Sequence, residues 1–235
     1  MTELALYIDI EGFGLKFENG GKKSFIDLTN DLHSLGQNIF SYLSIIQFGG
    51  DGFLIKENLS YENKISRFID LSVALLQIIT LRGGTGRVQI SNGYMSDISG
   101  LYSNEIQKEI QSNNQNILGG NNYNIMLINP VIGTSIINCY KLKGPKGPLL
   151  LVDNNLKEML ETEKIAFETL SYGKCTKYEV LNINWLKSKN ENTELILNHF
   201  NFKSIDVEEA LTNYIETNAL GLTNEWRSSA LNLLK

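Results

Sequence analysis

The first 95 residues alternate between strand-like and helix-like hydrophobic patterns, and this order strongly constrains the fold. Residues 4–10 (LALYIDI) form a short apolar run with one acid, Asp9, near its end, which is typical of a buried strand. Apolar residues at helical spacing predict one helix over about 24–42 and another over about 62–81. Between them, residues 43–57 (LSIIQFGGDGFLIKE) predict a β-hairpin, because glycine tolerates the positive φ of tight turns. Residues 86–95 (GRVQISNGYM) predict a further strand.

This order of strand, helix, hairpin, helix and strand predicts an α+β fold of the ferredoxin-like kind. Its sheet is mostly antiparallel, with the helices on one face and the first strand beside the hairpin. We expect a domain of residues 1–185 and a C-terminal helical extension of residues 186–235. The later predicted elements are helices near 103–111, 133–143 and 153–161, a strand at 148–152, and a closing hairpin of strands near 165–171 and 177–184.

Composition limits the classes of partner. The net charge of −5 argues against nucleic acid, whose binding proteins usually present a basic surface. The sequence has no run of eighteen apolar residues and no signal-peptide pattern, so we expect a cytoplasmic protein without a membrane partner. Cys139 and Cys175 lack CxxC spacing, which is typical of buried or incidental thiols in a reducing compartment.

Two acids occupy turns that the predicted sheet brings together. Asp9 ends the first strand and Asp51 lies in the hairpin turn. Two carboxylates that face one point repel each other, and a hard divalent cation relieves that repulsion. Each acid alone could serve only the geometry of its turn. Glycines that would let phosphate oxygens approach the backbone flank both acids: Gly12, Gly14, Gly50 and Gly52.

Four segments resemble motifs of the class III nucleotidyl cyclases. Tyr7–Gly14 (YIDIEGFG) and Phe48–Ile55 (FGGDGFLI) are similar to the two metal motifs of that family. Arg87–Met95 (RVQISNGYM) resembles the family's next strand, Arg-Val-Gly-Ile-x-x-Gly. Gly133–Leu142 (GTSIINCYKL) resembles a later helix, Gly-Asp-x-Val-Asn-x-Ala-x-Arg-Leu. The resemblance spans roughly residues 4–185.

The resemblance implies a site for two Mn²⁺ or Mg²⁺ ions, bound by Asp9, Asp51 and the backbone carbonyl of Ile10. It implies that the 3′-oxygen of a nucleoside triphosphate attacks its own α-phosphorus and expels pyrophosphate. A single catalytic domain per chain implies a homodimer with two shared sites. Lys141 is the further catalytic candidate. The expected substrate-binding residues are Gly12, Phe13, Gln47, Gly50, Arg87 and Lys174.

Several positions depart from the purine cyclases. Gln47 stands where a base-reading Lys or Glu is usual, and Pro130 replaces a second base-reading acid. Ile137 replaces the transition-state Asn, and Lys141 replaces the Arg of the same helix. Recognition of adenine or guanine in the usual manner is therefore not expected.

These departures resemble the pyrimidine cyclases of the bacterial Pycsar antiphage systems, as do YIDIEGF at residues 7–13 and the spacing of Gly133, Tyr140 and Leu142. That resemblance implies synthesis of cyclic UMP or cyclic CMP from UTP or CTP, with a companion effector that senses the product. Three alternatives stay open: an adenylate or guanylate cyclase, an inactive nucleotide-binding module and a diguanylate cyclase. The last would need a second acid where Gly52 stands.

The remaining cations have two interpretations. Lys141, Lys143 and Lys146 could contact the triphosphate, or could be cations at a helix C-terminus. Arg87 could reach a phosphate, although we favour an edge-strand charge that promotes solubility. Phe13 is expected to pack beneath the metal-binding turns.

Overall fold

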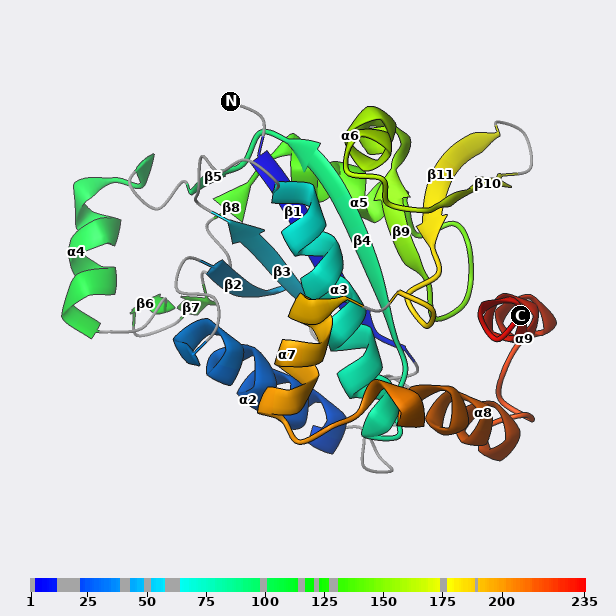
Figure 1. Cartoon of the computed structure of the whole chain (residues 1–235). Coiled ribbons are helices and arrows are strands. Elements are labelled where there is room, and N and C mark those ends of the chain that lie inside the picture. Colours follow the sequence, from blue (N-terminus) through cyan, green and yellow to red (C-terminus); the bar gives the residue numbers. More distant parts are fainter. Residues whose placement is uncertain are drawn as a thin grey trace.

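The computed structural model describes residues 3–11, 22–38, 43–48, 52–57, 64–97, 101–113, 117–120, 123–126, 131–173, 177–188 and 190–235. Over this part of the chain, a seven-stranded sheet in the order β10-β11-β9-β4-β1-β3-β2 forms the centre of the fold (Figure 1). Its strands are β1 (Glu3–Ile10), β2 (Leu43–Phe48), β3 (Gly52–Glu57), β4 (Gly86–Gly93), β9 (Leu150–Asp153), β10 (Glu168–Tyr172) and β11 (Tyr178–Ile183).

The predicted order of the first elements is confirmed. Helix α2 (Lys22–Asn38) follows β1, and α3 (Lys64–Leu81) follows the β2–β3 hairpin. Strand β1 pairs antiparallel with both β3 and β4, so the first strand lies beside the hairpin as expected. Of the paired strands in this sheet, only β4 and β9 run parallel. The described part of helix α2 ends at Asn38, and Leu43 begins β2, where the hairpin was predicted to start.

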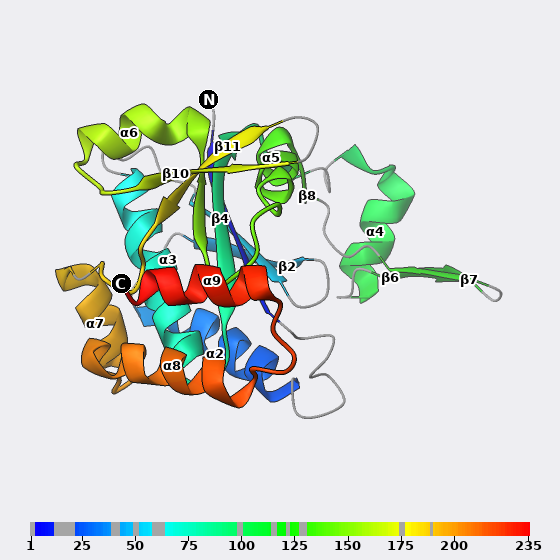
Figure 2. The same ribbon diagram turned by 90° about the vertical axis from the view of Figure 1, so that its right-hand side faces the viewer.

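Helices cover both faces of the sheet, so the expectation of one covered face is wrong. Successive side chains of a strand point to opposite faces. In β1, Leu6 and Ile8 pack in the large core with α2 and α3, whereas Ala5 and Tyr7 pack in a second cluster with α5 (Thr134–Lys141). Figure 2 shows α3 and α5 on opposite sides of β4.

The later elements follow the prediction closely. Strands β10 and β11 form the expected antiparallel hairpin. The segment after β4 contains α4 (Asn104–Asn113), which stands apart from the central sheet together with β6 and β7 (Figures 1 and 2). The other elements of this region are β5 (Ser96–Asp97), β6 (Ile117–Gly120), β7 (Tyr123–Met126), β8 (Val131–Ile132), the 3₁₀ turn η3 (Asn154–Leu156) and α6 (Lys157–Thr162).

The C-terminal segment is helical, as predicted, and belongs to the same core. It forms α7 (Glu191–His199), the 3₁₀ turn η4 (Ser204–Asp206), α8 (Val207–Thr217) and α9 (Asn224–Leu233). Side chains from α7, α8 and α9 are buried in one cluster with those of α3. The boundary between residues 185 and 186 stays a prediction. Among the described helices, none is long and apolar enough to span a membrane.

Candidate functional site

Asp9 lies next to the start of β3, as the sequence predicts. Its Cα is paired with Gly52 on one side and with Arg87 on the other. The strand alternation places Asp9 on the same face as Tyr7, and its side chain is 19% exposed. Asp51 precedes Gly52 directly in the chain but lies outside the described residues. The proximity of the two acid-bearing segments is thus a consequence of the strand register.

Arg87 is a buried residue of a central strand, so the edge-strand interpretation is wrong. It is 8% exposed, and β4 lies between β1 and β9. Its Nη1 donates to the carbonyl oxygen of Pro145 at 2.9 Å and to that of Lys143 at 3.4 Å. Its Nη2 lies 3.9 Å from Asp9 Oδ2 and 3.7 Å from Glu11 Oε1. The guanidinium therefore connects the loop after α5 to both carboxylates.

Glu11 is a residue of the site that the sequence analysis missed. Its Oε2 accepts a hydrogen bond from the indole Nε1 of Trp226 in α9. Burial raises the pKa of the Glu11 carboxyl above its ordinary value, whereas Arg87 and the Trp226 hydrogen bond act to lower it. Asp9 raises the pKa further and Lys146 lowers it. The strand period could have shown Glu11 on the face of Tyr7 and Asp9, but nothing local indicates Trp226.

Tyr7 fills the space beside Gly52. A Cβ added to Gly52 would lie 2.3 Å from the Tyr7 hydroxyl oxygen, so this glycine accommodates an aromatic ring and not a phosphate. Tyr7 is 2% exposed, and its ring centroid lies 5.3 Å from that of Tyr140. The ammonium of Lys143 lies 4.9 Å from the Tyr7 ring centroid and 4.0 Å from the Tyr140 centroid. Such cation–π contacts hold Lys143 over the face that carries Asp9.

Helix α5 carries the residues that the resemblance assigns to the transition state. Ile137 is 55% exposed, so an apolar side chain faces outward where the family has Asn. The amide of the next residue, Asn138, donates to the Asn92 carbonyl oxygen at 3.1 Å. The Lys141 side chain is exposed, and its carbonyl oxygen accepts from the Tyr172 hydroxyl at 2.6 Å. A catalytic role for Lys141 stays a prediction.

Cys139 is a buried structural thiol, as expected. It is 1% exposed, and burial raises its pKa to about 11, so it is not a nucleophile near neutral pH. Its sulfur lies 3.3 Å from Ser91 Oγ, beneath α5. Cys175 lies outside the described residues.

Other predicted site residues are not described. The side chain of Gln47 is undescribed, although its backbone belongs to β2 opposite Phe53. The predicted role of the Ile10 carbonyl is not tested. Five more positions singled out from the sequence lie outside the described residues: Gly12, Phe13, Gly50, Pro130 and Lys174.

Comparison with known proteins bears on the fold. No family model and no curated protein matches this sequence. The structure is similar to the adenylyl cyclase CyaB from P. aeruginosa, with a TM-score of 0.52 and 10% identity, over 81% of this chain and 96% of that one. It is also similar to the dimeric guanylyl cyclase domain of the RhoGC fusion protein from the aquatic fungus Blastocladiella emersonii, with a TM-score of 0.51 and 10% identity, over 77% and 95%. The chain has the class III nucleotidyl cyclase fold.

A third structure with this cyclase fold contains a nucleotide. The catalytic core of a rhodopsin-guanylyl cyclase with converted specificity, in complex with ATPαS, has a TM-score of 0.52 and 10% identity, over 77% of this chain and 94% of that one. Structural similarity at identities this low establishes the cyclase fold but not the reaction of this protein.

Of the two acids predicted to bind metal, Asp9 lies within the described residues. Asp9 offers carboxylate oxygens, which Mg²⁺ and Mn²⁺ prefer. No group of three or more His, Cys, Asp or Glu residues suited to a metal ion occurs among the described residues. The register of Asp9 with Gly52 brings the chain segment next to Asp51 to the same point. A metal site made by Asp9 and Asp51 stays a prediction, because Asp51 lies outside the described residues.

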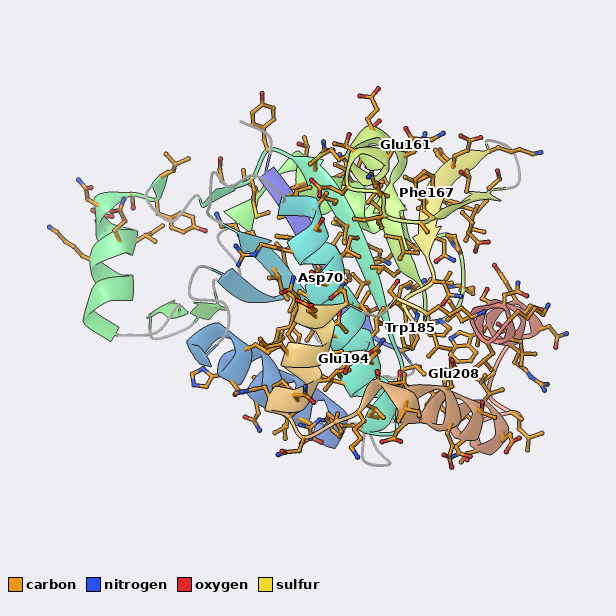
Figure 3. The ribbon with its side chains drawn as sticks, viewed as in Figure 1. Asp70, Glu161, Phe167, Trp185, Glu194 and Glu208 are labelled. Carbon is orange, nitrogen blue, oxygen red and sulfur yellow. The ribbon has the colours of Figure 1, made fainter. Side chains whose placement is uncertain are left out.

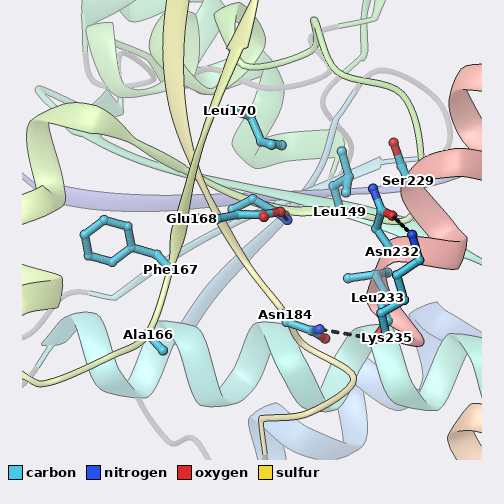
Figure 4. Close-up of a pocket in the computed structure, with 11 residues that line it drawn as sticks. Leu149, Ala166, Phe167, Glu168, Leu170, Asn184, Ser229, Asn232, Leu233 and Lys235 are labelled. Atoms are coloured by element: carbon cyan, nitrogen blue, oxygen red, sulfur yellow. Dashed lines mark hydrogen bonds between the residues drawn. The ribbon is translucent and has the colours of Figure 1, made fainter.

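A separate hollow of about 430 Å³ lies between the β10–β11 hairpin and α9 (Figure 4). Asp9 does not line it. Polar groups of Glu168, Asn182 and Asn232 line it together with apolar side chains such as Leu149 and Leu170. It does not coincide with the site predicted from the sequence.

Proposed function

We propose that the protein is a metal-dependent nucleotidyl cyclase that converts UTP or CTP into the 3′,5′-cyclic monophosphate and pyrophosphate. The observation that carries the proposal is the pairing of Asp9 with Gly52 within a class III cyclase fold. This pairing joins the two segments that carry the acids of both metal motifs. A fold alone hosts many activities, so the proposal depends on these acids.

In this proposal, Asp9, Asp51 and the carbonyl of Ile10 hold two Mn²⁺ or Mg²⁺ ions. Ions bound there favour the 3′-alkoxide and neutralise the triphosphate. The ammonium of Lys143, which lies over Tyr7, adds positive charge on the face that carries Asp9. In a homodimer, Lys141 of one protomer would contact the nucleotide held by its partner and stabilise charge on the α-phosphoryl group.

The preference for a pyrimidine is supported by the absence from this chain of side chains that purine cyclases use. Gln47 can donate or accept a hydrogen bond, so it does not distinguish uracil from cytosine. The exposed Ile137 cannot make the hydrogen bonds of an Asn. We favour UTP, and we place the cyclic product in antiphage defence as the messenger for a cyclic-nucleotide-sensing effector.

Incubation of the purified protein with each of the four nucleoside triphosphates and Mn²⁺ tests the reaction. We expect cyclic UMP or cyclic CMP, detected by mass spectrometry, and loss of product in both Asp9→Asn and Asp51→Ala because each removes a metal-binding charge. Asp153→Asn is the matched control, since Asp153 ends β9 at the opposite end of the sheet from Asp9. Cyclic AMP or cyclic GMP as the main product would contradict the pyrimidine preference.

An inactive nucleotide-binding module is the second candidate, and the exposed Ile137 favours it. Calorimetry separates the two functions. A triphosphate that binds with Mn²⁺ but yields no cyclic product or pyrophosphate would support the inactive module. Failure of every triphosphate to bind would contradict both functions.

A further inference from the structure

The C-terminal helix α9 contacts the turn that follows Asp9. Trp226, in the first turn of α9, is 7% exposed, and its indole N–H donates to Glu11, 215 residues earlier in the chain. Thr223 caps the helix, because its Oγ1 accepts from the Trp226 backbone N–H at 3.2 Å. The Tyr214 ring of α8 lies 5.9 Å from the indole. The indole is therefore held on several sides, and its N–H points at Glu11.

Glu11 is itself held from three directions. Its backbone N–H donates to the Thr85 carbonyl oxygen at 2.9 Å, just before β4. Its carboxylate accepts from Trp226 and lies 3.7 Å from Arg87 Nη2. A carboxylate with 12% of its side chain exposed needs such partners, because burial penalises its charge. Since Glu11 follows Asp9 by two residues, these contacts also fix the backbone around Asp9.

Helix α9 also packs against the loop that holds Arg87. A Cβ added to Gly147 would lie 2.6 Å from Cβ of Ser229, one helical turn after Trp226. The same loop provides the Pro145 carbonyl that binds Arg87 at 2.9 Å. Helix α9 therefore touches both groups that position the guanidinium, namely Glu11 and the loop after α5.

We propose that Trp226 is a positioning residue that links the C-terminal helix to metal binding at Asp9, an inference that rests on the proposed cyclase function. Arg87 Nη1 donates to the Pro145 carbonyl, and Nη2 lies between the two carboxylates, 3.7 Å from Glu11 and 3.9 Å from Asp9, beyond hydrogen-bond distance of both. Without the indole N–H, the buried Glu11 carboxylate loses the charge-assisted hydrogen bond that fixes its position beside the guanidinium. The guanidinium can then move onto Asp9 and compete with the cation.

The first test measures Mn²⁺ binding to the full chain by electron paramagnetic resonance. Trp226→Phe keeps an aromatic ring and removes the N–H, and we expect roughly 10-fold weaker Mn²⁺ binding, as for other groups that orient a metal ligand. Asn184→Ala is the matched control, because its side-chain amide donates to the Leu233 carbonyl at the other end of α9, at 3.1 Å, and not to Glu11. We expect unchanged affinity in the control.

The outcomes distinguish the two proposals. A wild-type protein that binds no Mn²⁺ overturns the proposed function. Wild-type binding that Trp226→Phe leaves unaltered overturns the positioning role alone. In the cyclase assay, Trp226→Phe should need a higher Mn²⁺ concentration to reach its half-maximal rate. Its rate at saturating Mn²⁺ should equal that of the wild-type protein. General destabilisation would not separate these two quantities.

A second measurement uses the wild-type protein, so it does not depend on whether a Trp226 variant folds. The sequence contains two tryptophans, so the wild-type protein has two indole N–H signals in a ¹⁵N-correlated NMR spectrum. We expect Mg²⁺ to shift the Trp226 signal and to leave that of Trp185 in place. If Mg²⁺ binds and the Trp226 signal does not move, the link between α9 and the metal site is refuted.

Discussion

Gly52 shows how one small residue determines what lies beside the site. The sequence suggests that it leaves room for phosphate, but the Tyr7 ring occupies that room. Tyr7 in turn supports Lys143 through a cation–π contact. The glycine therefore allows β1 to carry a large ring next to the hairpin, two residues before Asp9.

We predict that Gly52→Ala destabilises the protein by about 1–3 kcal/mol, because the added methyl group overpacks against Tyr7. Urea unfolding measures this loss. The penalty should shrink in a Tyr7→Ala background, where the ring is gone. Gly221→Ala is the matched control, since its nearest neighbour would be the Asn218 carbonyl oxygen at 3.7 Å. An equal penalty with and without the Tyr7 ring would contradict the steric explanation.

Helix α7 is attached to α3 through one buried acid. Asp70 of α3, labelled in Figure 3, is 7% exposed. It accepts hydrogen bonds from the side chains of Asn190 and Asn192. Asn190 also caps α7, because its side chain accepts from the Thr193 N–H at 2.8 Å. The carboxylate thus lies at the N-terminus of α7, where the helix dipole favours negative charge.

We predict that Asp70→Ala lowers the free energy of unfolding by about 1.5–3 kcal/mol through loss of these hydrogen bonds to a charged group. Faster hydrogen exchange of the α7 amides should accompany the loss. Asp206→Ala serves as control, because Asp206 precedes α8 without a side-chain cap hydrogen bond. Unchanged exchange in α7 would show that Asp70 does not hold this helix.

The segment that carries Asp9 and the C-terminal segment share one hydrophobic core. Helix α3 is buried between the sheet and the C-terminal helices, and side chains such as Ile196, Leu197 and Leu211 are at most 1% exposed. Full burial of one such side chain contributes about 1.5–3 kcal/mol. The C-terminal helices are therefore structurally part of the domain that carries Asp9.

We predict that a chain ending at residue 185 does not fold cooperatively, because it exposes the apolar surface of α3 that α7 and α8 cover. Thermal unfolding followed by circular dichroism should show no sharp transition, in contrast to the full chain. A cooperative, soluble truncated protein would instead show that residues 1–185 fold without the extension.

The sequence by itself determined the order and type of most elements. Local periodicity is enough for that, because an apolar stripe repeats at 3.6 residues in a helix and at 2 in a strand. The same pattern placed Asp9 at a strand end beside the hairpin, which the register confirms. The residues that would complete the metal site, Asp51 above all, stay a prediction.

Only the tertiary structure decided which residues surround Asp9. The parallel pairing of β4 with β9 makes β4 central and buries Arg87, which its sequence neighbourhood suggested was an edge charge. The contact of Trp226 with Glu11 joins residues 215 positions apart. Such contacts depend on how packed helices and strands meet, and no local hydrophobic pattern encodes that. The C-terminal helix could therefore be recognised from the sequence, but its place at the site could not.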